Sequence, residues 1–167
     1  MSSMPDQKRI VTNTTPLVAL AIATGSLDVL RFLYQEVVVP LEVCEEVAAG
    51  GKQGFGTQAF EAADWLVRCS APTLVAPYLS RVLDRGEAAV IQTALDRGIK
   101  LVCIDEAVGR RTARLSGLDL TGTVGLLLKA QKNGFPLSVR DALTTMRKKG
   151  IWLSDSVIQF ALGEATH

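Results

Sequence analysis

The sequence predicts an α/β protein whose central, mostly parallel sheet is covered by helices. Short runs of β-branched residues alternate along the chain with longer segments whose apolar residues recur at helical spacing. The chain has 167 residues, of which 48% are hydrophobic, so it can bury a full core. Strands are expected at residues 9–12, 36–39, 65–69, 100–104 and 118–121.

Helices are expected between these strands. Pro16 favours a first helical turn with Thr14 or Thr15 as its cap, and Ser26 is expected to cap the next helix. Pro40 is expected to open the helix "PLEVCEEVAAG", which a glycine pair stops. The following "GGKQGFGTQ" lacks the spacing of a phosphate-binding loop and is interpreted as a connection.

The second half of the chain continues the pattern. Amphipathic helices are expected over "RGEAAVIQTALDRG" and over "EAVGRRTARLSG", which ends at Gly117. The tail after residue 135 is expected to form two further helices separated by Gly150, with Ser154 and Asp155 at the start of the last one.

Composition narrows the functional classes. The net charge of +1 gives no overall basic field, so any site for a polyanion must be a local patch. Three cysteines without C-x-x-C spacing indicate free thiols, and one histidine leaves too few partners for a zinc site. The longest apolar run, residues 17–23, is too short to span a bilayer, so we expect a cytoplasmic protein without membrane contact.

Two polar residues stand at the expected ends of strands. Asn13 follows "RIVT" and Asp105 follows "KLVCI", and side chains at the carboxyl ends of parallel strands project into the crevice where α/β proteins bind ligands. Asp105 is equally compatible with a simpler role as the cap of the following helix.

Two further acids lie on neighbouring helices. Glu87 opens a helix, where it either serves the site or complements the helix dipole. In "VCEEV", helical spacing places Glu46 beside the core-facing stripe and Glu45 on the far side, although a residue at the edge of a stripe is commonly just half-exposed. If these acids converge with Asn13, a cation must neutralise them, and oxygen ligands suit Mg²⁺ or Mn²⁺.

The ordered set of motifs resembles the PIN-domain family, metal-dependent ribonucleases that include toxins of toxin–antitoxin pairs. The resemblance rests on "IVTNTTPLVAL", "VVVPLEVCEEV", "DRGEAAVIQTAL" and "LVCIDEAVGRRTARLSGLDLTGTVGLLLKA", and "RKKGIWLSDSVIQFAL" resembles the tail of small prokaryotic PIN-like proteins predicted to bind nucleic acid. It implies a three-layer α/β/α fold in a single domain over residues 1–167, with a core at about 8–130 and a helical extension at about 131–167.

The resemblance also implies residue roles. Glu46, Glu87 and Asp105 correspond to the family's metal-binding acids, and Asn13 stands where the first aspartate usually lies. These four residues form the expected catalytic set, with Mg²⁺ or Mn²⁺ as cofactor and single-stranded RNA as substrate. Because Asn13 brings no charge, two alternatives stay open, a ribonuclease or a weakened or inactive PIN-like module that binds nucleic acid or protein.

Arg110, Arg111 and Arg114 follow Asp105 on one expected helix. They are candidates to hold RNA phosphates, and the alternative is a solvated helix face. With 5% aromatic residues, base stacking is not expected to dominate binding. The partners that the resemblance implies are RNA, a small antitoxin protein and a second copy of the chain in a homodimer.

Overall fold

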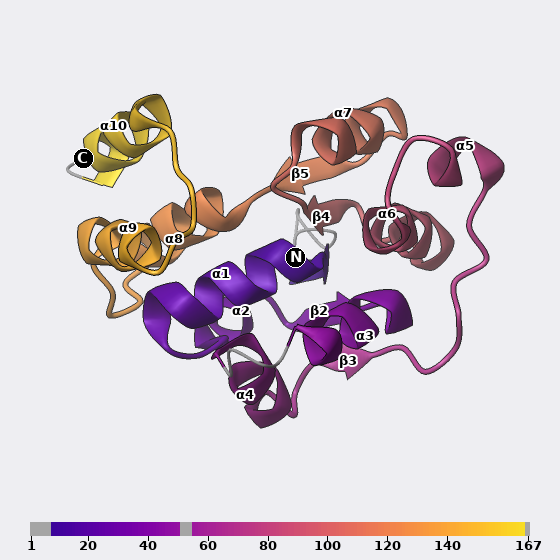
Figure 1. Ribbon diagram of the computed structural model, residues 1–167, viewed down its shortest axis with the longest axis horizontal. Coiled ribbons are helices and arrows are strands. Elements are labelled where there is room, and N and C mark those ends of the chain that lie inside the picture. Colours follow the sequence, from indigo (N-terminus) through magenta and orange to yellow (C-terminus); the bar gives the residue numbers. More distant parts are fainter. Residues whose placement is uncertain (1–7, 51–54, 166–167) are drawn as a thin grey trace, which may run out of the picture.

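The computed structural model describes residues 8–50 and 55–165, in which five parallel strands are flanked by helices (Figure 1). This arrangement confirms the expected α/β/α fold. The strands are β1 (Arg9–Thr12), β2 (Glu36–Val39), β3 (Val67–Arg68), β4 (Leu101–Cys103) and β5 (Asp119–Thr121). Their order is β3-β2-β1-β4-β5, so β1 lies in the centre with β2 and β4 as neighbours. The direction of the winding reverses at β1, which makes the carboxyl ends of β1 and β4 the expected ligand crevice.

The central strands are apolar runs without alternation, because helices cover both faces of a parallel sheet. β2 reads "EVVV" and β4 reads "LVC", and the three residues of β4 are all buried. The observed β3 is shorter than the segment expected from sequence, since only Val67 and Arg68 pair with β2 at this edge of the sheet.

Ten helices lie in the described part of the chain, and most follow the expected positions. They are α1 (Thr14–Thr24), α2 (Asp28–Leu33), α3 (Leu41–Ala49), α4 (Phe55–Ala62), α5 (Pro77–Ser80), α6 (Arg85–Arg97), α7 (Ala107–Leu115), α8 (Thr123–Lys132), α9 (Val139–Lys148) and α10 (Asp155–Ala165). The expected connection "GGKQGFGTQ" is corrected in part, because α4 already begins at Phe55, whereas residues 51–54 lie outside the described residues.

The start of α1 differs from the expectation. Thr14 and Thr15 are the first residues of the helix, and Asn13 occupies the N-cap position without a side-chain capping hydrogen bond. The prediction that Thr14 or Thr15 caps this helix is therefore wrong. The hydroxyl of Thr14 turns instead to α3, where Oε1 of Glu46 accepts its hydrogen bond at 2.6 Å.

Helix packing gives the crevice its walls. α6 packs against β1, β4 and α3, and α7 packs against β5. α9 and α10 lie beside α1 and α8 at the left of Figure 1. No helix among the described residues has the length and apolar character required to cross a membrane.

Candidate metal centre

The candidate site lies where β1 and β4 end side by side. The backbone N–H of Asn13 donates to the carbonyl of Cys103 at 3.1 Å, so the chain leaving β1 runs next to the chain leaving β4. Asp105 and Glu106 follow two and three residues after Cys103. The first turn of α6 faces the same point, because α6 packs against both strands.

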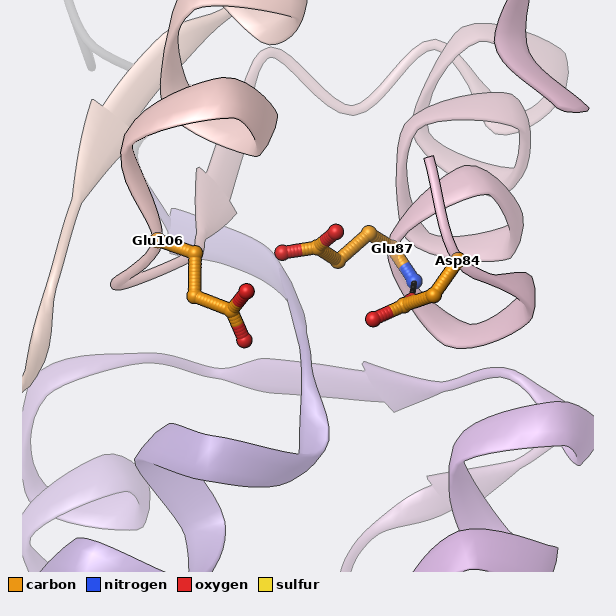
Figure 2. Close-up of side chains that lie close together, drawn as sticks. All are labelled: Asp84, Glu87 and Glu106. Carbon is orange, nitrogen blue, oxygen red and sulfur yellow. Dashed lines mark hydrogen bonds between the residues drawn. The ribbon is translucent and has the colours of Figure 1, made fainter. Parts of the chain in front are cut away.

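Three carboxylates gather at this point. Asp84, Glu87 and Glu106 each offer an oxygen, and these oxygens all lie within 4.8 Å of one another. Figure 2 shows Glu106 pointing from the start of α7 toward Glu87, which comes with Asp84 from the start of α6. We call these three residues the acidic cluster.

Local helix geometry positions two members of the acidic cluster. Asp84 is the N-cap of α6, and its Oδ1 accepts a hydrogen bond from the backbone N–H of Glu87 at 2.8 Å. The side chain of Glu87 then reaches toward α7, where Gly109 leaves room for it. A Cβ at Gly109 would lie 3.1 Å from Oε2 of Glu87 and closer still to Ile104, so a side chain there would crowd the carboxylate.

Glu87 is an acid in an unfavourable place for a charge. Its side chain is buried, with 4% of the residue exposed, and its Oε2 has no hydrogen-bond partner among the described residues. Burial, and then the negative charges of Asp84 and Glu106, raise the pKa of Glu87 to about 7. Such a carboxyl either keeps a proton or requires a cation, and a set of carboxylate oxygens fits Mg²⁺ or Mn²⁺.

Glu46 lies next to the acidic cluster but does not belong to it. Besides accepting from Thr14, its carboxylate packs on the backbone of Gly86, where a Cβ would overlap Oε1 of Glu46. Glu45 points elsewhere and forms an exposed ion pair with Arg85 at 2.6 Å. Of the two neighbouring glutamates, Glu46 therefore faces the site, in the direction that helical spacing indicates.

Asp105 is bound to the start of α8. Its Oδ1 accepts from the backbone N–H of Thr123 at 2.8 Å, and its Oδ2 accepts from the Thr123 hydroxyl at 2.7 Å. The alternative in which Asp105 caps α7 is wrong, because Glu106 occupies that N-cap position. The structure thus groups Glu106, and not Asp105, with Glu87 in the acidic cluster.

Asn13 is buried at the start of α1, with 4% of the residue exposed. It adjoins Thr14, which binds Glu46, and its backbone binds β4, so it links two walls of the crevice. Its side chain adds amide dipoles and no charge to the site.

The three arginines of α7 divide into two kinds. Arg110 donates through one terminal nitrogen to the carbonyl of Ile104 at 2.7 Å and to that of Thr121 at 3.3 Å, which ties together the ends of β4 and β5. Arg111 and Arg114 are exposed. Of the three arginines, Arg111 and Arg114 are therefore the better candidates for phosphate binding.

Sequence reasoning missed Asp84 and Glu106. The signal for Asp84 was its place directly before the helix α6, because aspartate is favoured at an N-cap. Glu106 had no signal of its own beyond adjoining Asp105. A third unexpected acid, Glu42, is buried and accepts from both the backbone and the hydroxyl of Thr73. Burial opposes its charge, yet these hydrogen bonds lower the pKa of Glu42, so its role is to anchor the Thr73 segment.

Fold and site together define a parallel α/β protein with a polar crevice at the carboxyl ends of its strands and an acidic cluster that could bind a metal. The chain belongs to the PIN-domain family, whose family model matches residues 9–167. The matched region includes α9 and α10. No protein with a curated description matches the sequence.

Proposed function

We propose that this protein is a metal-dependent ribonuclease that cuts single-stranded RNA. One observation carries the proposal: the buried Oε2 of Glu87 lacks a partner within the described structure while two more carboxylates face it in the ligand crevice of a PIN fold. Three acids held together at the cost of mutual repulsion are typical of a cation site.

Two ligand sets are to be distinguished. The resemblance assigns the metal to Glu46, Glu87 and Asp105, with Asn13 positioning a ligand, whereas the geometry favours Glu87 with Glu106 and Asp84. Glu87 is common to both sets. Asp105 has both oxygens in hydrogen bonds to Thr123, which supports a role in fixing the crevice wall.

When bound, Mg²⁺ or Mn²⁺ would supply activation of a water and charge stabilisation at phosphorus. The residues of the protein would orient the carboxylates and hold the RNA strand. Thr14 fixes Glu46, the backbone of α6 fixes Asp84, and exposed Arg111 and Arg114 are candidates for phosphate contacts.

A second function is favoured by Asn13. A neutral side chain at the usual place of the first aspartate reduces the charge available to a cation, which supports a PIN-like module that binds RNA or protein without cutting. Incubation of purified protein and RNA with Mn²⁺ distinguishes the two functions. Cleavage of the RNA supports the ribonuclease, and metal-independent binding without cleavage supports the module.

The biological setting extends the same proposal. A PIN ribonuclease of this size fits the toxin of a toxin–antitoxin pair, acting in the cytoplasm as a homodimer that a small antitoxin protein inhibits. Growth arrest on expression, relieved by loss of Glu87, is the expected outcome for a toxin.

The test of the metal site is calorimetric titration with Mn²⁺. We expect Glu87→Gln to weaken Mn²⁺ binding by at least about tenfold, because it removes a ligand charge that both sets require. A larger effect from Glu106→Gln than from Asp105→Asn supports the acidic cluster, and the reverse order supports the set implied by resemblance. Glu45→Gln, an exposed neighbour of Glu46, is the matched control. Equal Mn²⁺ affinity in wild type and Glu87→Gln would reject the site.

A further inference from the structure

A pocket adjoins the acidic cluster. It has a volume of about 700 Å³ and lies between the end of β5, the start of α8 and the segment joining α9 to α10. Its polar lining includes Asp105, Glu106 and Arg110, and because Glu106 also belongs to the acidic cluster, the two sites are contiguous. We call this pocket the C-terminal pocket.

The remaining lining of the C-terminal pocket is largely apolar and unusually exposed. Trp152 is 83% exposed and Phe160 is 63% exposed, and both line the pocket together with the exposed side chain of Val157. Large apolar side chains that are exposed beside a polar site are typical of a binding surface. The aromatic content of the chain is only 5%, yet two aromatic residues, Trp152 and Phe160, line this one pocket.

We propose that the C-terminal pocket takes one unpaired nucleobase of the RNA strand whose backbone lies at the acidic cluster. This inference rests on the proposed function and names the part of the substrate that is read outside the metal site. The indole of Trp152 offers a flat face for stacking, and every base has a π-face that can use it.

The lining favours a base over other occupants. The volume of about 700 Å³ falls in the range of pockets that hold small molecules, roughly 300–1,000 Å³. Thr15 and Ser154 also line the pocket. The Ser154 hydroxyl accepts from the backbone N–H of Val157 and keeps its own proton as a donor for the polar edge of a base, which a lipid chain would not use. Asp105 and Glu106 disfavour an acidic peptide, whereas a base is neutral.

A single RNA strand can reach from the acidic cluster to the C-terminal pocket. Glu106 stands at the start of α7 between them, and Arg110 lies one helical turn further on. A phosphate near the acidic cluster therefore leaves the neighbouring base within reach of the C-terminal pocket. An unstacked, single-stranded substrate satisfies this geometry, since a base in a duplex is already stacked and paired.

The experiment compares two nucleic-acid strands in Ca²⁺, which binds carboxylate oxygens and so neutralises the acidic cluster toward phosphate. Recovery of intact strands after the measurement shows that cleavage has not entered. The first is a single-stranded RNA of about 12 nucleotides, and the second is the same ribose-phosphate strand without bases. We expect wild type to bind the RNA about tenfold more tightly than the abasic strand. Trp152→Ala should remove this preference, and Trp152→Phe should keep most of it. Leu74→Ala, at an 89% exposed position that follows β3 at the other edge of the sheet, should leave it unchanged.

A spectroscopic readout reports on the pocket directly. Trp65 and Trp152 are the two tryptophans of the chain, so Trp65→Phe leaves Trp152 as the sole indole fluorophore, and RNA but not the abasic strand should quench it. Equal affinity for the two strands, or a preference that survives Trp152→Ala, would overturn the proposal. So would sedimentation showing that Trp152→Ala dissociates a dimer, which would assign the pocket to a second copy of the chain. If base preference fails while Mn²⁺-dependent cleavage persists, only the pocket is rejected; if cleavage fails while base preference persists, only the ribonuclease is rejected.

Discussion

Glu87 combines burial with negative neighbours on two sides. A glutamine or an apolar residue would avoid this cost, yet α6 presents the carboxylate of Glu87 opposite Gly109. Asp84 accepts from the backbone N–H of the same residue and so caps the helix. Because the charged form is disfavoured in the absence of a cation, the pKa of Glu87 rises to about 7. A cation bound at Glu87 would favour its charged form, so the proposed metal binding would be coupled to the stability of the fold.

The raised pKa has a defined effect on stability in EDTA. The folded state favours protonated Glu87, so its contribution is fully present below the ordinary pKa of 4.5 and is lost as the pH rises through about 7. We expect wild type to lose roughly 1–3 kcal/mol relative to Glu87→Gln between about pH 4 and about pH 8. Urea unfolding of both proteins across this range measures the difference. Parallel pH profiles would show that Glu87 does not titrate in this way.

Asn13 permits a test of the missing charge. We expect Asn13→Asp to raise Mn²⁺ affinity, because a carboxylate would join the wall of the crevice that already holds Glu46. In EDTA the same variant should be less stable by on the order of 2 kcal/mol, since the new charge is buried near other acids. Calorimetry and thermal unfolding provide the two measurements. A variant unchanged in both would place Asn13 outside the electrostatic reach of the metal site.

At the scale of elements, glycines allow helices to approach the acids. Gly86 in α6 receives the carboxylate of Glu46 from α3, and Gly122, just before α8, receives that of Asp105. A Cβ at Gly122 would lie 2.7 Å from Oδ1 of Asp105. At both positions the carboxylate packs on the backbone of the glycine, and a larger residue there would push it away.

Gly86→Ala tests this arrangement. Alanine favours the helix by up to about 1 kcal/mol, but its Cβ would displace the carboxylate of Glu46 from Thr14. We therefore expect little net gain in stability, together with altered Mn²⁺ affinity if Glu46 acts at the site. Gly163→Ala in α10 is the matched control, because a Cβ there meets no atom within 4 Å, and it should stabilise the protein by about 0.5–1 kcal/mol. Equal stabilisation by both variants would show that Glu46 moves aside at no cost.

At the scale of the whole molecule, the net charge of +1 gives no overall attraction for RNA, so the proposed RNA binding requires a local basic patch. We expect the double variant Arg111→Gln/Arg114→Gln to weaken RNA binding across sequences. It should also reduce the salt dependence by about 0.7 in logarithmic slope for each lost phosphate contact. Arg110 is left intact because it binds the ends of β4 and β5. RNA binding measured from low to high salt gives the slope, and Arg140→Gln, at another exposed arginine, is the control. An unchanged slope would show that Arg111 and Arg114 belong to a solvated helix face and do not contact phosphates.

The bounds of the strands could be predicted from sequence in the centre of the sheet but not at its edge. β1 and β2 have the expected bounds, because β-branched residues buried between two helical layers leave a clear apolar run. β3 is shorter than expected because an edge strand pairs on one side only, and its length depends on its neighbour. The N-cap of α1 could not be predicted as well, because Asn13 and the two threonines that follow it are all residue types that favour this position.

The sequence by itself determined the fold class and the end of the sheet at which polar groups collect, because both follow from local apolar patterns and from the direction of parallel strands. Only the tertiary structure decided which acids share a site. Asp105 and Glu106 are adjacent in sequence, yet one binds Thr123 of α8 and the other faces Glu87 of α6. Their directions depend on how α6, α7 and α8 pack around β4, and such contacts between distant segments leave no local signal in the chain.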